Sequence, residues 1–187
     1  MSGPEKHVAA EVDLLGPNSI KARYLLVAAT RAHLSIHENE WRPALRDLRA
    51  LDAEWTWCLD FEHDELPFEW RETYALTSSD GRVHVLMSIE FQEDQAYIER
   101  LAIAPCNRGD NRVVGVGAAL FLHAVGRSID RGLQGRVTLH SLEDPRTVAF
   151  YERMGMRQCG VDAVDGSNMR HFELLPVDAE SLLARAR

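Results

Sequence analysis

The chain has 187 residues, of which 45% are hydrophobic and 27% are charged, and it carries a formal net charge of −8 at pH 7. These proportions suit one globular domain with an ordinary core, and they exclude collagen-like, coiled-coil and intrinsically disordered proteins. Its three cysteines are too few for a disulfide framework or a thiolate zinc site. An acidic balance disfavours nucleic acid as a partner, and no apolar run approaches the ~18 residues of a membrane helix. The first residues also lack the basic-then-apolar pattern of a signal peptide, so we expect a cytoplasmic protein whose partners are neither nucleic acid nor membrane.

The N-terminal third of the chain gives weak structural signals. Residues 1–19 contain two Gly-Pro pairs and are expected to form a poorly ordered arm. The apolar pattern of residues 20–36 fits either a helix or a strand followed by a turn. A clearer helix is predicted over residues 41–54, with leucines on one face and a proline in its first turn. An acidic stretch that holds three of the four tryptophans follows it.

Strand and helix signals are clearer in the rest of the chain. Strands over residues 73–77 and 83–91 flank a Ser-Ser-Asp-Gly turn, which predicts a hairpin. The later elements are strands at 96–104, 136–142, 158–164 and 169–175, and helices at 113–131 and 145–154, the last with Asp144 as its N-cap. The strand–helix–strand order requires a crossover between parallel strands, whereas the hairpins are antiparallel. The sequence therefore predicts an α/β fold with a mixed, mostly antiparallel sheet of about six or seven strands and helices on both faces.

A glycine-containing motif opens the helix predicted at residues 113–131. Residues 112–117 read Arg-Val-Val-Gly-Val-Gly and follow a strand and a polar loop. The first turn of a helix has unpaired N–H groups and a partial positive charge, and glycines there let an anion approach the backbone. Arg112 would add a cationic group for a phosphate. The alternative explanation is that the small residues allow close packing of the helix on the sheet.

Two further segments accompany this motif and define a resemblance. Residues 101–105 read LAIAP, and residues 148–156 read VAFYERMGM. Together with RVVGVG at 112–117, these segments resemble the GNAT superfamily of acyl-CoA-dependent N-acetyltransferases, including a bacterial subgroup of uncharacterised substrate. The resemblance covers about residues 70–176. The sequence departs from the family pattern in the loop before the motif, which Cys106–Asn111 lengthens, and in Val113, which stands where a glycine is common. Arg108-Gly109 is a competing register, but no G-x-G follows it at the proper offset.

The resemblance implies a GNAT domain over residues 20–176, with residues 20–72 as its variable acceptor side and 177–187 as a C-terminal tail. It implies acetyl-CoA as co-substrate, held between the strands at 96–104 and 136–142. The expected cofactor-binding residues are Leu101, Ala102, Ile103, Arg112, Val113, Val114, Gly115, Val116, Gly117, Ala118 and Tyr151. The expected activity is direct transfer of an acetyl group to a primary amine, either a small molecule or a peptide. Homodimers are common in this superfamily, so a second copy is an expected partner.

The chemistry of this transfer needs an acid for the leaving thiolate and a base for the amine. Tyr151 matches the family position whose phenol protonates the sulfur; its alternative role is packing the helix on the sheet. Glu99 lies on the central strand and is the candidate base, with a salt bridge as the alternative explanation. His140, in the next strand, is the alternative base, although a lone strand histidine is more often structural.

The acidic aromatic stretch is the candidate acceptor site. Trp57, Glu62, Asp64 and Glu65 could form a cage for a cationic amine through cation–π and carboxylate contacts. The alternative is a solvated loop with core tryptophans. His33 and His37 are spaced i, i+4 but lack the glutamate of a zinc protease motif, so no metal is expected. The rival functional hypothesis is a degenerate GNAT protein that binds acyl-CoA as a sensor without turnover.

Overall fold

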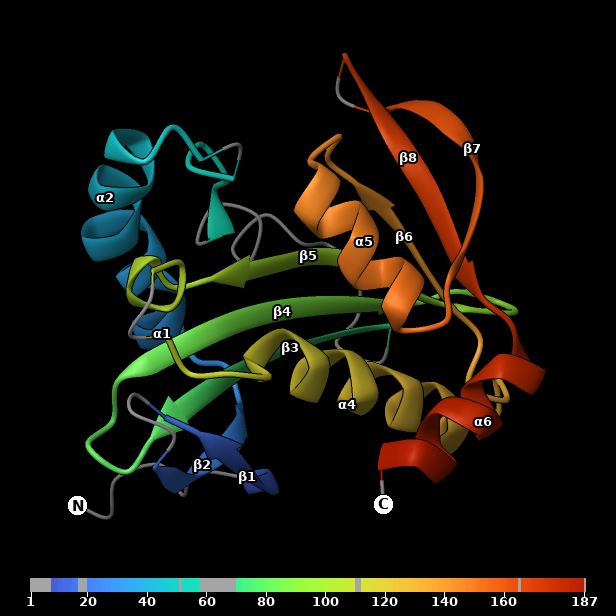
Figure 1. Cartoon of the computed structure of the whole chain (residues 1–187), viewed down its shortest axis with the longest axis horizontal. Helices are drawn as coiled ribbons and strands as arrows, with labels where there is room; N and C mark the ends of the chain where they lie inside the picture. The colour runs from blue at the N-terminus through green and yellow to red at the C-terminus, as the bar shows by residue number, and fades with distance from the viewer. Residues whose placement is uncertain are drawn as a thin grey trace. The chain divides into compact units, whose positions relative to one another are not determined.

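The computed structural model describes residues 8–16, 20–50, 52–57, 70–109, 112–164 and 166–186. It is a mixed α/β structure with one eight-stranded sheet in the order β1-β2-β3-β4-β5-β6-β8-β7 (Figure 1). The strands are β1 (Val8–Leu15), β2 (Lys21–Ala28), β3 (Arg71–Ser78), β4 (Val83–Phe91), β5 (Ala96–Ile103), β6 (Val137–Ser141), β7 (Arg157–Val164) and β8 (Ser167–Leu174). The helices are α1 (Arg31–Ile36), α2 (Arg42–Asp47), α4 (Val116–Asp130), α5 (Pro145–Arg153) and α6 (Pro176–Ala186), with a π-helical segment at His37–Trp41 and a 3₁₀ turn at Pro105–Asn107. No helix among these described residues is long and apolar enough to cross a membrane.

The predicted fold class is confirmed, and the strand pairing explains it. β5 and β6 are parallel, with Ala96–Ile98 opposite Val137–Leu139, and α4 supplies the crossover between them. The pairings β1–β2, β2–β3, β6–β8 and β7–β8 are antiparallel. Asp144 caps α5 as expected, because its carboxylate accepts a hydrogen bond from the Thr147 backbone N–H at 2.9 Å.

The two ends of the chain differ from the prediction. Val8–Leu15 is not a poorly ordered arm but strand β1, which pairs with β2 and brings the sheet to eight strands. Cross-strand ion pairs support this hairpin, with Lys21 Nζ 3.1 Å from Asp13 and Arg23 Nη1 3.0 Å from Glu11. The expected C-terminal tail contains α6, which forms because Ala179 and Leu182 give it a buried face.

The chain divides into two compact units, which we call the first unit (Met1–Ser88 and Arg100–Leu120) and the second unit (Ile89–Glu99 and Phe121–Arg187). β4, β5 and α4 contribute residues to both. The first unit buries one apolar cluster in which Leu34, Trp41 and Leu45 from the helical segment are joined by residues of β2, β3, β4 and β5. The helix predicted at 41–54 instead starts at Arg31 and stops after Asp47, where Arg49 has a positive φ of 52°.

His37 lies inside this cluster and begins the π-helical segment. Its side chain is fully buried, with the ring 5.8 Å from that of Trp41 and 6.0 Å from that of Trp57. Neither ring nitrogen has a hydrogen-bond partner among the described residues. Burial lowers the pKa of His37 to about 4, because a charged imidazole would lose its hydration there. The ring therefore stays neutral at physiological pH.

This burial predicts an acid-sensitive contribution to stability. The unfolded chain binds a proton at this imidazole below about pH 6.5, whereas the folded chain does so only near pH 4. The neutral imidazole therefore makes its full contribution to the free energy of unfolding above about pH 6.5, and this contribution is lost progressively as the pH falls toward 4. Between pH 7 and pH 5 we expect the wild type to lose about 2 kcal/mol more than His37→Leu. Urea denaturation of both proteins at each pH measures the difference. Equal losses in the two proteins would show that His37 is not the responsible group.

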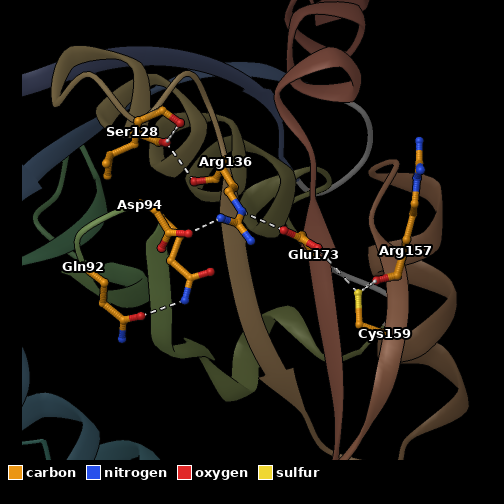
Figure 2. Close-up of polar contacts among 9 residues, drawn as sticks. Gln92, Asp94, Ser128, Arg136, Arg157, Cys159 and Glu173 are labelled. Carbon is orange, nitrogen blue, oxygen red and sulfur yellow. Dashed lines mark hydrogen bonds and ion pairs between the residues drawn. The ribbon is translucent and has the colours of Figure 1, made fainter.

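The second unit has a polar network at the start of β6 (Figure 2). Arg136 forms ion pairs with Asp94 and, at 2.7 Å, with Glu173 of β8. The Ser128 hydroxyl of α4 donates a hydrogen bond to the Arg136 carbonyl at 2.8 Å. The Cys159 thiol of β7 lies 3.7 Å from Glu173, and burial raises its pKa. These contacts anchor the first residues of β6 to α4, to β8 and to the turn before β5.

Candidate functional site

The N-terminus of α4 carries the predicted anion-binding motif, in the first unit. Gly115 immediately precedes the helix and has a φ of +89°, a conformation that strains any residue with a side chain. Val116 begins the helix, and Gly117 lies in its first turn. The Arg112 side chain, three residues before Gly115, is exposed. The segment therefore combines a glycine-dependent turn, a helix N-terminus and an accessible cation, which is the arrangement that favours a phosphate.

Two of the expected backbone donors are already occupied. The Val113 N–H donates to Asn107 Oδ1 at 3.2 Å, and the Val114 N–H donates to the Leu15 carbonyl at 2.8 Å. Fewer backbone N–H groups of residues 112–118 are therefore available to an anion than predicted. The amides that remain as candidates are those of residues 115–118, in the turn before α4 and in its first helical turn.

The loop before α4 is held by residues that sequence reasoning missed. Asn107 is buried, and its amide nitrogen lies 3.2 Å from both Nδ1 and the carbonyl oxygen of His84. Arg108 forms an ion pair with the buried Asp52 and donates a hydrogen bond to the Ile103 carbonyl at 3.1 Å. Arg108 is therefore tied to the first unit, which favours Arg112 as the arginine that faces a ligand. A buried asparagine in a polar loop has no distinctive sequence signal, so its anchoring role was not predictable.

The predicted thioester-contacting residues occupy the end of β5. Ala102 is fully buried in the first unit's core, whereas Leu101 and Ile103 are half-buried on the other face of the strand.

Glu99 and His140 share one face of the sheet in the second unit. Tyr97 pairs with Thr138 in the parallel register, and side chains alternate along each strand, so Tyr97 and Glu99 point to the same side as Thr138 and His140. The Tyr97 hydroxyl lies 3.0 Å from His140 Nδ1. The structure thus brings the candidate base and its alternative to one face, and both side chains are half-buried.

Tyr151 lies on the opposite face of this part of the sheet. The centroid of its ring lies 5.6 Å from that of Phe172 of β8. Phe172 is next to His171 along the strand, so its side chain points to the face opposite that of His171 and of His140, with which His171 pairs. Phe121 of α4 and Phe150 of α5 complete its surroundings, at 6.4 and 5.1 Å between ring centroids. Burial raises the pKa of the Tyr151 phenol, so it keeps its proton at neutral pH. Candidate acid and candidate base therefore lie on different sides of the sheet.

The expected acceptor cage is only partly described. Trp57 is 3% exposed and packs in the first unit's core beside His37, so its ring is a core element and not an open wall for a cationic amine. Apolar burial explains this placement better than recognition of an acceptor. Glu62, Asp64 and Glu65 lie outside the described residues.

Two comparisons by sequence find no match. No protein-family model matches the chain. No curated protein matches it either.

Comparison by structure does find similar proteins. A spermidine N-acetyltransferase from Vibrio cholerae, solved in complex with CoA and spermine, is 18% identical with a TM-score of 0.61, over 84% of this chain and 98% of that one. A chimera of the Vibrio cholerae enzyme with hSSAT has a TM-score of 0.63 at 18% identity and the same coverage. A nourseothricin acetyltransferase overlaps less, over 56% of this chain and 64% of that one, at 23% identity and a TM-score of 0.49. The Vibrio cholerae structures confirm that the chain has the GNAT fold.

Proposed function

We propose that the chain is an acyl-CoA-dependent N-acetyltransferase that moves an acetyl group from acetyl-CoA to a primary amine. The observation that carries this proposal is the positive φ of Gly115 at the N-terminus of α4, with Gly117 in the first turn of that helix and an exposed Arg112 before it. A helix N-terminus of this form fits the pyrophosphate of CoA. The GNAT fold, and the CoA bound by the Vibrio cholerae spermidine N-acetyltransferase, support this assignment.

The proposed mechanism is direct transfer in a ternary complex. Glu99 takes the proton of the attacking ammonium, directly or through water, with His140 as the alternative base. The amine nitrogen then forms a bond to the thioester carbonyl carbon, and the bond from carbon to sulfur breaks. Tyr151 donates its phenolic proton to the leaving sulfur, which gives free CoA thiol and an N-acetylated amine. The nitrogen releases its second proton to solvent as the amide forms, and the proton on the base returns to the phenolate through solvent, so the enzyme is restored.

The opposite faces of acid and base agree with this sequence of steps. The base acts on the amine nitrogen as it adds to the carbonyl carbon, and the acid acts on the sulfur as the tetrahedral intermediate collapses. The two proton transfers therefore involve different atoms and can be served by two separate groups. The buried phenol is well suited to donate, because its raised pKa keeps it protonated until a sulfur anion develops beside it.

A thiol-release assay with a panel of amines tests the proposal. The panel holds spermidine, spermine, lysine, aminoglycosides and peptide N-termini, so that it covers both small-molecule and peptide amines. We expect amine-dependent release of CoA thiol and an acetylated product by mass spectrometry. Binding of acetyl-CoA without turnover on any amine would instead support the rival function, an acyl-CoA sensor.

The two candidate bases are separated by matched variants. We expect Glu99→Gln to lower kcat about tenfold, which is less than general base catalysis typically contributes, because water can still carry the proton. His140→Gln should lower kcat less than about threefold. Both variants are assayed from pH 6 to pH 9 with saturating amine. The reverse order of effects would assign the base to His140.

A further inference from the structure

A cluster of two imidazoles and one carboxylate lies on the sheet of the second unit, whereas the residues of the proposed CoA motif belong to the first unit. His140 of β6 pairs directly with His171 of β8. Asp162 of β7 is two residues beyond Gly160, which pairs with His171, so Asp162 is the diagonal neighbour of His171 on the same face. Their rings and carboxylate converge: the two imidazoles stack with centroids 5.0 Å apart, and Asp162 Oδ2 lies 2.9 Å from His140 Nε2.

The ligand atoms are spaced as a metal site requires. His171 Nδ1 lies 3.9 Å from Asp162 Oδ2, and all three ligand atoms fall within 4.8 Å of one another. Ligand atoms around a tetrahedral zinc ion are about 3.3 Å apart. The two separations from Asp162 Oδ2, 2.9 and 3.9 Å, lie on either side of that value, and the two imidazole nitrogens lie within 4.8 Å of one another, so rotation of the side chains would place three atoms around one ion. The strands that hold them are paired, which limits how far the residues can move apart.

The surroundings of the cluster are also suited to a metal ion. The Asp162 side chain is 54% exposed and that of His171 is 32% exposed, so an ion can enter from solvent and keep an open coordination position. The His140 side chain is more enclosed, with 19% of its surface exposed. Its Nδ1 atom, the ring nitrogen that faces away from Asp162, lies 3.0 Å from the Tyr97 hydroxyl. When Nδ1–H donates to the Tyr97 hydroxyl oxygen, Nε2 carries no proton and can bind a metal.

We propose that His140, Asp162 and His171 form a binding site for a divalent transition-metal ion of the zinc class. Two imidazoles and one carboxylate are ligands that zinc, nickel and copper favour, whereas magnesium and calcium prefer oxygen donors alone. The proposal does not depend on acetyl transfer, because the site is defined by the second unit's own side chains. An ion at this site would occupy His140 Nε2 and would leave Glu99 as the base.

Calorimetric titration of tag-free, chelator-treated full-length protein with ZnCl₂ tests the site without acetyl-CoA. We expect one ion per chain with a micromolar Kd. Asp162→Asn and His171→Ala each remove a ligand and should weaken binding more than about 100-fold, beyond the range for loss of an outer partner. Tyr97→Phe removes the outer hydrogen bond and should weaken binding about tenfold.

The matched control is Glu143→Gln, which removes an exposed carboxylate that pairs with Arg170 of β8. It should bind zinc as the wild type does. A second readout is the visible absorption of Co²⁺, whose intensity reports a tetrahedral site and should be lost in Asp162→Asn, a substitution at an exposed position that leaves the core unchanged. Absence of zinc binding by the wild type up to millimolar concentration would overturn the proposal. So would equal binding by the wild type and both ligand variants.

Discussion

Tyr151→Phe is expected to lower kcat about 10- to 1000-fold while the affinity for acetyl-CoA changes less than about threefold. The substitution removes one hydroxyl and keeps the ring that packs against Phe121, Phe150 and Phe172. Since the aromatic packing is retained, the fold should be unaffected. Loss of the proton donor slows departure of the thiolate, which is a transition-state effect and so appears in kcat. Steady-state thiol release with the best amine of the panel gives both constants.

Tyr74→Phe is the matched control for this substitution. Tyr74 is also a buried tyrosine, and its hydroxyl donates a hydrogen bond to Glu72 in the first unit at 2.5 Å. Its variant should keep the wild-type kcat within about twofold, because this hydroxyl has no part in the proposed proton transfers. A Tyr151→Phe enzyme with undiminished kcat would remove Tyr151 from the mechanism. The GNAT fold would be unaffected by that result.

Gly117→Glu is expected to abolish the stabilisation that acetyl-CoA confers. The new carboxylate would stand in the first turn of α4, where it fills the space of the pyrophosphate and repels its charge. With acetyl-CoA at about 100 times its Kd, binding stabilises the folded wild type by about 2.7 kcal/mol. For a chain of this size that corresponds to a rise in Tm of about 5–10 °C. Thermal unfolding with and without acetyl-CoA measures the shift.

Two further variants keep this prediction specific. Gly126→Glu places the same side chain farther along α4, where an added Cβ meets no atom within 4 Å, and should retain the shift. Arg112→Glu changes an exposed residue and should reduce the affinity without affecting the core. If Gly117→Glu is folded by circular dichroism and still shows the full shift in Tm, the ligand does not bind at this helix N-terminus.

Local chemistry explains why the middle of the fold could be predicted. Pro105 cannot continue a strand, so it marks the end of β5. Asp144 followed by Pro145 is a helix start, and the structure has the expected cap. Gly115 and Gly117 follow a strand and a polar loop and predicted the start of a helix, which the structure places at Val116. Each of these signals depends on a few neighbouring residues.

The features that were not predicted depend on pairing between distant segments. β1 has little strand pattern of its own and is defined by its register with β2. The π-helical segment at His37–Trp41 follows from packing of His37 and Trp41 in a shared core. Trp57 joins that core for the same reason, although its acidic neighbours suggested an acceptor site. Tertiary burial overrides local composition at each of these places.

The His140–Asp162–His171 cluster also depends on pairing between segments that are distant in the sequence. A bulge between Gln158 and Gly160 shifts the register of β7 by one residue. Without it, Cys159 would oppose His171, and Asp162 would point to the other face, because one residue of slip inverts the side-chain alternation. Gly160 is a local signal for this bulge, because an isolated glycine inside a strand favours one, but it does not specify which side chains then meet across the strands. The convergence of the three side chains follows from the register of the strands.

Calorimetric titration of the wild type with acetyl-CoA tests the central claim most directly. The protein is tag-free, folded by circular dichroism and shown by mass spectrometry to carry no co-purified CoA. We predict one molecule bound per chain with a micromolar Kd, since the amides of residues 115–118 and Arg112 would meet the pyrophosphate. No heat of binding up to millimolar acetyl-CoA would mean that the chain has the GNAT fold without its co-substrate, and would contradict the proposed acetyltransferase activity.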